Sequence, residues 1–324
     1  MSILEKIRQY MDNNPRLKPY LLMWLRKTTK TINEWPQEKF INGVMDCYER
    51  RVGYRFDINN PVTFNEKLQW YKVFYQRDDF GYITDKVTFK EYIKNKLGGG
   101  YTIPMYGWWD NVKDFKRDWD KLPEEFVLKS NLAANASGVM IIKKKSEVDF
   151  KDLKKKVSFW LKKRNTLLNS WDCHFYNSTP KILAEKYMSN FEGHLLDYKF
   201  FCFNGKPYCL YVQQKALGAG SDQLIFYRLD WSRIDASWGQ VGDREFSKPK
   251  HFQEMIRIAK VLSEGFPFVR VDFFDTEDKL YVGELTFAPG GGCGQIKPLS
   301  FQKELGDMFI LPIDGTLSNT SNIG

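Results

Sequence analysis

The stretch FVRVDFFDTEDKLYVGELTFAPGGG, which runs from Phe268 to Gly292, decides the fold. Its residues alternate in polarity on both sides of the polar segment DTEDK, as expected for a two-stranded antiparallel hairpin. A loop of residues 277–279 sets Asp272 directly opposite Glu284. Opposed carboxylates have Cβ atoms about 5 Å apart, and like charges so placed are destabilising unless a cation lies between them. The hairpin therefore predicts a cation beside these two carboxylates.

The predicted register also sorts the other side chains of the hairpin into two faces. Arg270 falls opposite Thr286, on the same face as the two carboxylates. The other face is apolar and is expected to join the core. Its members are Val269, Val271, Phe273, Tyr281, Leu285 and Phe287. The hairpin thus combines a charged face with a core face.

Length and composition indicate a folded protein. A chain of 324 residues with 43% hydrophobic and 16% aromatic content can bury a large core and divide into two or more subdomains. Its five cysteines include no CxxC pair, which argues against a disulfide framework and a zinc finger. The N-terminal apolar run YLLMWL is short and flanked by charges, so it predicts neither a signal peptide nor a membrane span. We expect a cytoplasmic protein.

The net charge of +9 indicates an anionic partner, which could be a nucleotide, a nucleic acid, an acidic glycan or a membrane surface. Basic residues are spread along the chain instead of clustering on one element, as they do in nucleic-acid readers. The run FKDLKKKVSFWLKKR, residues 150–164, is typical of an amphipathic surface helix. The segment Leu17–Lys30 could touch the inner face of a membrane, but a helix packed on its own protein is favoured.

The order of the predicted elements indicates an α+β fold. Residues 1–95 form a helical lead-in, with helices in PQEKFINGVMDCYERRVG and in TFNEKLQWYKVFYQRD, the second opened by Thr63 as N-cap and Glu66 three residues later. The glycines of residues 98–100 mark a boundary. Strand patterns follow in EEFVLK, GVMIIKK, KILAEKYM, LLDYKFFCFNGKPYCLYV and QLIFYRLDW, and then a helix in KPKHFQEMIRIAKVLSEG.

Three charged residues stand in or at the end of these apolar strand patterns. Lys129 ends EEFVLK before the small-residue loop NLAANASG, Glu185 ends KILAE, and Lys199 lies inside LLDYKFFCF. A strand, a lysine and a flexible loop are one way to hold phosphates. Taken alone, Lys129 is better explained as a strand-end lysine in solvent.

Taken in order, these residues resemble the ATP-grasp superfamily from about Ile83 to Pro298. That superfamily has Arg-x-Asp on one strand and Glu-x-Asn on the next, followed by a turn of proline and glycine. The matching positions in this chain are Arg270, Asp272, Glu284 and Thr286, then Pro289 and Gly290. Thr286 stands where the superfamily has asparagine.

The resemblance implies a set of nucleotide contacts. TDKVTFKEYI resembles the early Asp-Lys segment, FVLKSN supplies a second lysine, and ILAEKYM resembles the hinge that receives adenine. In QQKALGAGSD a lysine takes the place of an arginine that contacts phosphate in relatives. The implied ATP-binding residues are Lys86, Lys129, Glu185, Lys186, Tyr187, Met188, Lys199 and Lys215.

The resemblance also assigns the charged face of the hairpin. It implies that Asp272, Glu284 and Thr286 hold magnesium, a hard ion that takes oxygen ligands, against the phosphates of ATP. Arg270 is then the catalytic residue that stabilises an acyl phosphate and the oxyanion that follows. The alternative without a metal is a pair of carboxylates kept apart by water or paired with Arg270.

A narrower resemblance is to the branch typified by the teichuronopeptide biosynthesis protein. PVTFNEKLQWYK, LPEEFVLKSN, DYKFFCFNGKP, FPFVRVDFF and YVGELTFAPGGG carry it. It implies an ATP-grasp fold, in which two α+β subdomains clasp ATP, after the helical region. The expected boundaries are 1–95 for the helical region, 96–313 for the ATP-grasp domain, about 101–183 and 184–313 for its subdomains, and 314–324 for a disordered tail.

The implied function is a carboxylate–amine ligase of bacterial surface polysaccharide assembly, which joins an amine or amino acid to a uronic acid or amino sugar. Its expected partners are ATP and an acidic glycan or amino acid, without nucleic acid. Three alternatives stay open: a glycan kinase, a nucleotide-binding protein without turnover, which the single glycine of NLAANASG permits, and a nucleic-acid binder. The sequence leaves open the substrates, the oligomeric state and contact with a membrane or a glycan-assembly enzyme.

Overall fold

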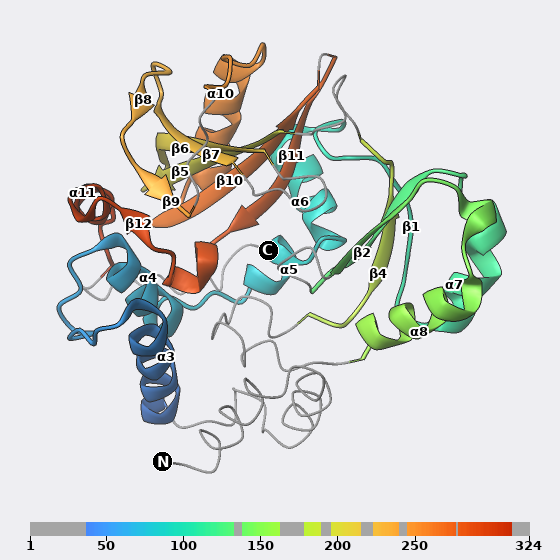
Figure 1. Cartoon of the computed structure of the whole chain (residues 1–324), viewed down its shortest axis with the longest axis horizontal. Helices are drawn as coiled ribbons and strands as arrows, with labels where there is room; N and C mark the ends of the chain where they lie inside the picture. Colours follow the sequence, from blue (N-terminus) through green and yellow to red (C-terminus); the bar gives the residue numbers. More distant parts are fainter. Residues whose placement is uncertain are drawn as a thin grey trace.

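The computed structural model describes residues 37–132, 138–162, 178–188, 196–214, 223–239, 245–276 and 278–312. Within them the strands form a four-stranded sheet, a six-stranded sheet and a two-stranded sheet (Figure 1). Helices accompany both larger sheets. The predicted α+β class is confirmed.

Helices dominate the part of the chain before the first sheet. They are α3 (Gln37–Val52), α4 (Phe64–Phe74), α5 (Phe80–Thr84) and α6 (Thr88–Leu97). The predicted start of α4 is confirmed, because the Thr63 side chain accepts a hydrogen bond from the backbone N–H of Glu66 while the Glu66 carboxylate accepts one from the Thr63 N–H. This reciprocal cap satisfies two donors that a helix start otherwise leaves unpaired.

The four-stranded sheet has the order β1-β4-β2-β3. Its strands are β1 (Met105–Trp109), β2 (Phe126–Ser130), β3 (Val139–Ile142) and β4 (Ile182–Glu185). Its helical elements are α7 (Val112–Asp118), η2 (Trp119–Lys121), η4 (Lys145–Glu147) and α8 (Phe150–Trp160). A separate apolar core, which includes Phe115, Phe126 and Val157, lies between this sheet and helices α7 and α8.

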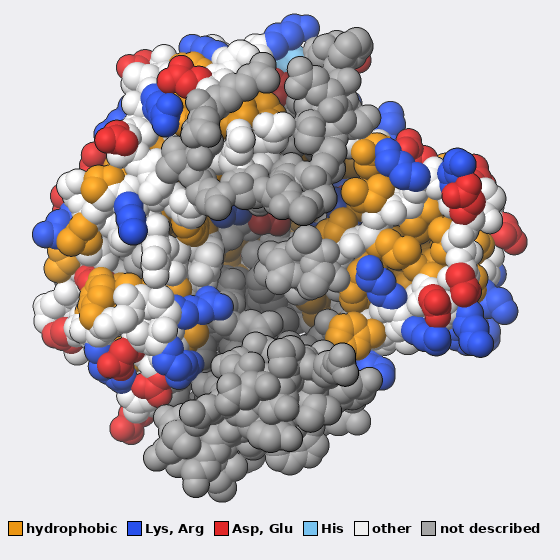
Figure 2. All heavy atoms as spheres, viewed as in Figure 1, with side chains coloured by type: hydrophobic (Ala, Val, Ile, Leu, Met, Phe, Trp, Pro, Cys, Tyr) orange, Lys and Arg blue, Asp and Glu red, His pale blue; other side chains and the backbone are white. Residues whose placement is uncertain are grey.

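Helix α8 confirms the predicted amphipathic surface helix. Its Leu153, Val157 and Trp160 are buried, whereas the lysines between them are exposed. Figure 2 shows basic and acidic side chains mixed around an apolar area on this part of the molecule. The mixture of charges is typical of a solvated surface.

The six-stranded sheet has the order β11-β10-β5-β6-β7-β8. Its strands are β5 (Leu196–Phe203), β6 (Lys206–Gln214), β7 (Gln223–Arg228), β8 (Arg233–Ile234), β10 (Phe268–Asp275) and β11 (Leu280–Thr286). The other elements near it are β9 (Ser237–Trp238), α10 (Phe252–Ser263), η5 (Pro289–Gly292), β12 (Ile296–Lys297) and α11 (Leu299–Met308).

Helices cover both faces of the six-stranded sheet. Phe252 of α10 packs against Phe200 on one face, with ring centroids 5.9 Å apart. Phe64 of α4 packs against Phe201 on the other face, at 5.5 Å. Because successive residues of a strand point to opposite faces, Phe200 and Phe201 anchor different layers. The largest apolar core of the described chain joins these layers.

The predicted hairpin of β10 and β11 is confirmed in its first half and wrong in its second. Asp272 pairs with Glu284, as predicted. Gly283 is then passed over, so that Phe273 pairs with Val282 instead. This β-bulge inserts one residue into β11 and reverses which side chains share a face. A Cβ at Gly283 would lie 2.7 Å from the Phe274 ring, which leaves no room for a larger residue there.

The bulge corrects the predicted core face. Val282, and not Tyr281, shares the face of Phe273 and belongs to the main core. Tyr281 pairs with Phe274 and lies under Lys279, whose Nζ is 5.6 Å from the centre of the ring. Alternation alone cannot locate a bulge, because it assumes one residue on each strand at every step.

One face of α4 holds the glycine-rich turn that follows β11. Three side chains spaced four and three residues apart each donate a hydrogen bond to a carbonyl of this turn, as the period of a helix allows. These contacts are Asn65 to Gly294, Gln69 to Gly292 at 2.6 Å and Lys72 to Gly291 at 2.8 Å. The helical lead-in therefore positions the chain immediately after the charged hairpin.

Several expectations lie outside the described residues: the segment Leu17–Lys30, the tail 314–324 and most of the loop NLAANASG. Among the helices that the structure describes, none is both long enough and apolar enough to cross a lipid bilayer.

Candidate active site

Four polar side chains form a row across one face of the six-stranded sheet. The strand registers set Tyr211 opposite Lys199, Lys199 opposite Asp272, and Asp272 opposite Glu284. Directly opposed residues share a face and have Cβ atoms about 5 Å apart. The row therefore brings together side chains from β6, β5, β10 and β11, and Lys199 and Asp272 within it are 73 residues apart in the sequence.

Asp272 is paired with two cations of the protein itself. Arg270 Nε donates to Asp272 Oδ1, and Arg270 Nη2 donates to Oδ2, both at 2.6 Å. Lys199 Nζ donates to Oδ2, also at 2.6 Å. All three residues are buried. The cation that the facing carboxylates require is thus supplied here by Arg270 and Lys199.

Glu284 has a more open position. Its side chain is 45% exposed, and Arg270 Nη2 lies 3.4 Å from its Oε1. The Thr286 hydroxyl donates to the same oxygen at 2.9 Å and accepts from Arg270 at 3.0 Å. Desolvation opposes the ionised form of Glu284, but the charges of Lys86, Arg270 and Lys199 outweigh it and lower its pKa to about 2. Glu284 is therefore an ionised and accessible carboxylate at neutral pH.

A second charged cluster lies on the four-stranded sheet. Glu185 is 5% exposed and forms ion pairs with Lys129 at 2.6 Å and Lys90 at 2.5 Å. Glu185 pairs with Val127 in the sheet, so Lys129 occupies the diagonal position on the same face. Desolvation opposes the charge of Glu185, but the two lysines outweigh it and lower the pKa of this carboxyl.

Sequence reasoning did not identify Lys90 as part of this cluster. Lys90 lies on α6, and its Nζ also donates to the Ile103 carbonyl at 2.6 Å. It follows Lys86 by four residues, which is the spacing of neighbours on a helix surface. This spacing is the feature of the sequence from which Lys90 could have been identified.

Lys86 lies between the two clusters. Its Nζ donates to the Asn131 carbonyl at 3.4 Å. Burial lowers the pKa of Lys86, and the charges of Glu284 and Glu185 act against this effect. Lys86 is thus influenced by the charge of one carboxylate from each large sheet.

The residue before Lys86 fixes its place. Asp85 is 2% exposed, and its Oδ2 accepts from Asn131 Nδ2 at 2.7 Å and from Lys181 Nζ at 3.0 Å. Asp85 Oδ1 accepts from the Val87 N–H at 2.8 Å. These bonds tie the start of α6 to the ends of β2 and β4.

The predicted adenine hinge follows β4 directly. The Lys186 N–H donates to the Pro104 carbonyl at 2.9 Å, and the Lys186 residue is exposed. Lys143 Nζ lies 3.3 Å from the centre of the Tyr187 ring, and Met188 is half-buried. Lys215 lies outside the described residues.

A model of the TupA-like ATPgrasp family matches residues 66–310. The chain belongs to this family. The match includes α4 from Glu66 onward, the two charged clusters and the glycine-rich turn. No curated protein matches the sequence.

Solved structures with similarity to this TupA-like ATP-grasp protein include two D-alanine–D-alanine ligases. The ligase from Bacillus anthracis complexed with ATP has 17% identity and a TM-score of 0.42, over 71% of this chain and 65% of that chain. The ligase from Helicobacter pylori has 15% identity and a TM-score of 0.40, over 71% and 61%. N5-carboxyaminoimidazole synthetase from Staphylococcus aureus complexed with ADP has 17% identity and a TM-score of 0.38, over 63% of this chain and 44% of that chain. The chain thus spans less than two thirds of the length of these proteins.

The oxygen atoms of the charged hairpin fit a hard divalent cation. Glu284 and Thr286 offer a carboxylate and a hydroxyl side by side, the ligand chemistry that magnesium accepts. Asp272 stands beside them but is engaged by Arg270 and Lys199. Within the described residues, no group of three or more His, Cys, Asp or Glu is placed to hold a metal. The described residues alone therefore do not supply a complete set of metal ligands.

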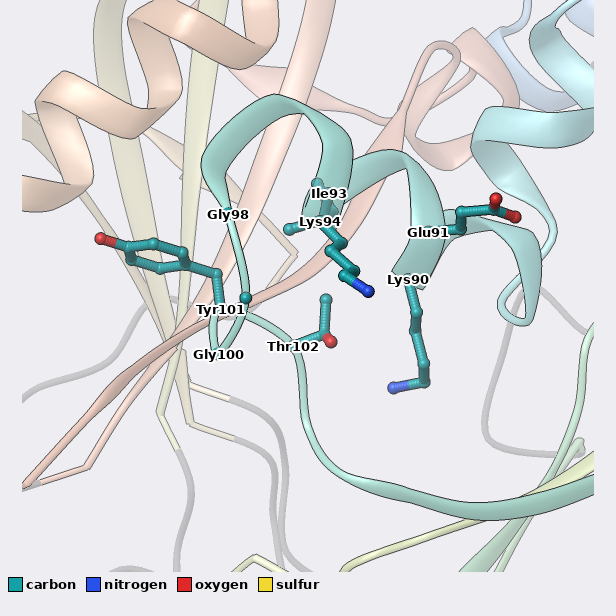
Figure 3. A pocket seen from close by; sticks show the side chains of 9 residues that line it. Lys90, Glu91, Ile93, Lys94, Gly98, Gly100, Tyr101 and Thr102 are labelled. Atoms are coloured by element: carbon teal, nitrogen blue, oxygen red, sulfur yellow. The ribbon is translucent and has the colours of Figure 1, made fainter.

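A cavity of about 410 Å³ adjoins the second cluster. Figure 3 shows Lys90 and Lys94 projecting from α6 toward the segment that carries Thr102. Lys90 lines this cavity and also pairs with Glu185, whereas Asp272 and Glu284 do not line it. The cavity therefore borders the cluster around Glu185 from the side of α6.

Proposed function

We propose that this TupA-like ATP-grasp protein is an ATP-dependent ligase that joins a carboxylate to an amine. The observation that carries the proposal is a charged cluster on each large sheet, with the carboxylates of Glu185 and Glu284 both acting on the charge of Lys86. The carboxylate attacks the γ-phosphorus of ATP to give an acyl phosphate and ADP. The amine then attacks the acyl carbon and releases phosphate.

The lysines bind and orient the nucleotide in this proposal. Lys86 and Lys129 supply positive charge for the phosphates, and Glu185 with the backbone of residues 186–188 receives the adenosine. Glu185 already holds Lys129 at 2.6 Å and Lys90 at 2.5 Å, so these lysines need little rearrangement. Preorganised charges of this kind contribute most to phosphoryl transfer, which depends on positioning and electrostatics.

Glu284, Thr286 and Asp272 are the residues that would hold magnesium. When bound, the ion neutralises charge on the phosphates during transfer. Ionised Glu284 offers an oxygen ligand without losing a proton, because its pKa is about 2.

Arg270 acts on the charge that develops during the reaction. Asp272 binds its guanidinium in bidentate fashion, and the Tyr211 hydroxyl accepts from Nη1 at 3.2 Å. A guanidinium fixed at several points costs little to orient, so its charge is available to an acyl phosphate or an oxyanion. Tyr211 is thus a positioning residue that sequence reasoning did not identify.

The proposed chemistry needs no nucleophile from the protein. The four cysteines within the described residues are all buried. Burial raises the pKa of Cys202 and Cys209, which keeps these thiols protonated and unreactive. A covalent thioester route therefore has no support at Cys202 or Cys209.

For the substrates we propose a carboxylate of an acidic glycan or an amino acid, within bacterial surface polysaccharide assembly. The net charge of +9 supports an acidic partner. The runner-up is a kinase on the same scaffold, which would transfer the γ-phosphate to a glycan hydroxyl.

Hydroxylamine separates ligase from kinase. It is a small nucleophile that replaces the natural amine, so the protein with ATP, magnesium and its carboxylate should yield a hydroxamate and ADP. Uronic-acid oligosaccharides and free amino acids are the carboxylates to screen. Glu284→Gln should abolish the product, whereas Lys206→Met, at an exposed position on β6, should not. Release of AMP and pyrophosphate, or a phosphorylated sugar without hydroxamate, would contradict the proposal.

A further inference from the structure

The carboxylate of Asp272 is occupied by cations of the protein itself. Oδ1 accepts one hydrogen bond and Oδ2 accepts two, all at 2.6 Å, from Arg270 and Lys199. The side chain of Asp272 is only 3% exposed. Magnesium binds oxygen at about 2.0–2.1 Å, so an ion on Oδ2 would face two positive charges on the same atom. Their repulsion makes Asp272 a poor metal ligand while both contacts persist.

Glu284 is not paired as closely with cations of the protein as Asp272 is. Its contact with Arg270 is longer, 3.4 Å against 2.6 Å for Asp272, and its side chain is 45% exposed. The charged face of the hairpin therefore offers a divalent cation one accessible carboxylate and the hydroxyl of Thr286. Magnesium is usually bound through one or two carboxylates together with substrate phosphates, so this partial site should bind it weakly without a nucleotide.

Lys199, one of the two cations over Asp272, is a group that also binds phosphate. Lysine binds phosphate oxygens as a point charge on a flexible stem. Lys199 has a second anionic partner, because its Nζ lies 3.3 Å from Asp197 Oδ2. It can therefore leave Asp272 without losing all compensation of its charge. A buried carboxylate that loses one of its two cations is costly, which favours a replacement cation.

We propose, on the basis of the proposed function, that Lys199 masks Asp272 as a metal ligand until the phosphates of a nucleotide draw it away, while Arg270 stays on the carboxylate. The nucleotide then completes the metal site in two ways, by adding phosphate oxygens and by releasing Asp272. Nucleotide and metal consequently bind with positive coupling, and by linkage each strengthens the other. Lys199 is in this sense a positioning residue that sets the order in which the site is filled.

The test measures metal binding to the full chain without nucleotide. The probe is Mn²⁺, a divalent ion that accepts the same oxygen ligands, and its free concentration is followed by electron paramagnetic resonance. Lys199→Met removes one masking charge and should raise Mn²⁺ affinity about tenfold over the unmodified protein, a typical size for such couplings. Lys199→Gln is a second neutral variant for the case that the methionine variant does not fold. Adding Asp272→Asn to either variant should remove the gain.

Three outcomes would overturn the masking: Mn²⁺ affinity of the unmodified protein equal to that of the Lys199 variants, a gain that survives Asp272→Asn, or the same gain in Lys206→Met. Lys206 is exposed on β6 and serves as the matched control. A rise in thermal midpoint with ATP and magnesium tests the nucleotide site separately. If ATP and magnesium do not raise the thermal midpoint while the Lys199 variants still bind Mn²⁺ more tightly, the proposed function is contradicted. The masking of Asp272 would then still stand.

Discussion

Lys90 places its Nζ 2.5 Å from Oε1 of Glu185 and so ties helix α6 to strand β4. Glu185 is buried, and Lys129 is its only other ion-pair partner among the described residues. Lys90→Met should therefore lower the free energy of unfolding by about 1–3 kcal/mol, the usual cost of leaving a buried polar group underpaired. Urea denaturation monitored by tryptophan fluorescence measures this change.

The matched control for this variant is Lys94→Met. Lys94 lies one helical turn further along α6 and is exposed. Its replacement should change stability by less than about 0.5 kcal/mol, as is usual for surface positions. Equal stability of the two variants would show that Lys90 does not contribute to holding Glu185.

A second prediction separates the roles of Lys129 and Arg270. Lys129→Ala should weaken nucleotide binding, because Lys129 already supplies positive charge to the phosphates when ATP is bound in the ground state. Arg270→Ala should leave ATP affinity nearly intact and lower turnover, because its charge acts in the transition state. Equilibrium dialysis with ATP gives the affinity, and ADP release gives kcat.

Arg270→Ala requires a check of folding. It leaves Asp272 with Lys199 as its remaining described cation and should cost about 3–5 kcal/mol of stability, as when one partner of a buried ion pair is removed. Affinity and turnover are therefore compared at a temperature where circular dichroism shows the variant to be folded. Equal losses of ATP affinity in the two variants would rule out the division of roles.

The first half of the hairpin was predictable because it depends only on alternation. Any register that sets even-numbered residues of the two strands opposite each other places four side chains on one face, namely Arg270, Asp272, Glu284 and Thr286. The bulge at Gly283 was not predictable in this way, since nothing in the alternation shows which residue is skipped. The predicted position of Tyr281 failed for this reason.

Some features of the site could not be predicted because they depend on which strands pair with each other in the sheet. Lys199 was predicted as a nucleotide contact, but its position opposite Asp272 depends on how β5 pairs with β10. Local patterns do not specify such pairing. Tyr211 enters the site through a further strand pairing, between β5 and β6. Strand β1 was not predicted either; it has only five residues, and Gly107 weakens its strand pattern.

A third prediction concerns the turn that α4 holds. Gly292 has φ of +67°, and a Cβ there would lie 2.3 Å from Gln69 Nε2 and 3.0 Å from Leu68 Cβ. Gly292→Ala should therefore lower the free energy of unfolding by about 1–3 kcal/mol, from backbone strain and from displacement of Gln69. Gly99→Ala is the control, because a Cβ there meets no atom within 4 Å. Equal urea midpoints for the two variants would contradict this account of the turn.

The last prediction is the pH dependence of stability at Glu284. The pKa of its carboxyl is about 2 in the folded protein, against an ordinary value of 4.5. Between these values the folded state binds fewer protons than the unfolded state, so stability falls as the pH drops. The contribution of Glu284 is thus fully present above about pH 4.5 and is lost as the pH falls toward 2. The charges of Lys86, Arg270 and Lys199 are its source.

Glu284→Gln removes this titration while keeping the shape of the side chain. The difference in unfolding free energy between the unmodified protein and Glu284→Gln should be constant from pH 7 to about 5 and should shrink as the pH falls below about 4.5. Urea denaturation at steps of pH measures it. The difference should also shrink with added salt, because the carboxylate is 45% exposed and its interactions are partly screened. Glu264→Gln, at an exposed carboxylate on the surface, should show no comparable difference. Carbon NMR of the labelled carboxyl gives the midpoint directly, and a midpoint at or above 4.5 would show that the three cations do not act on Glu284 as the structure indicates.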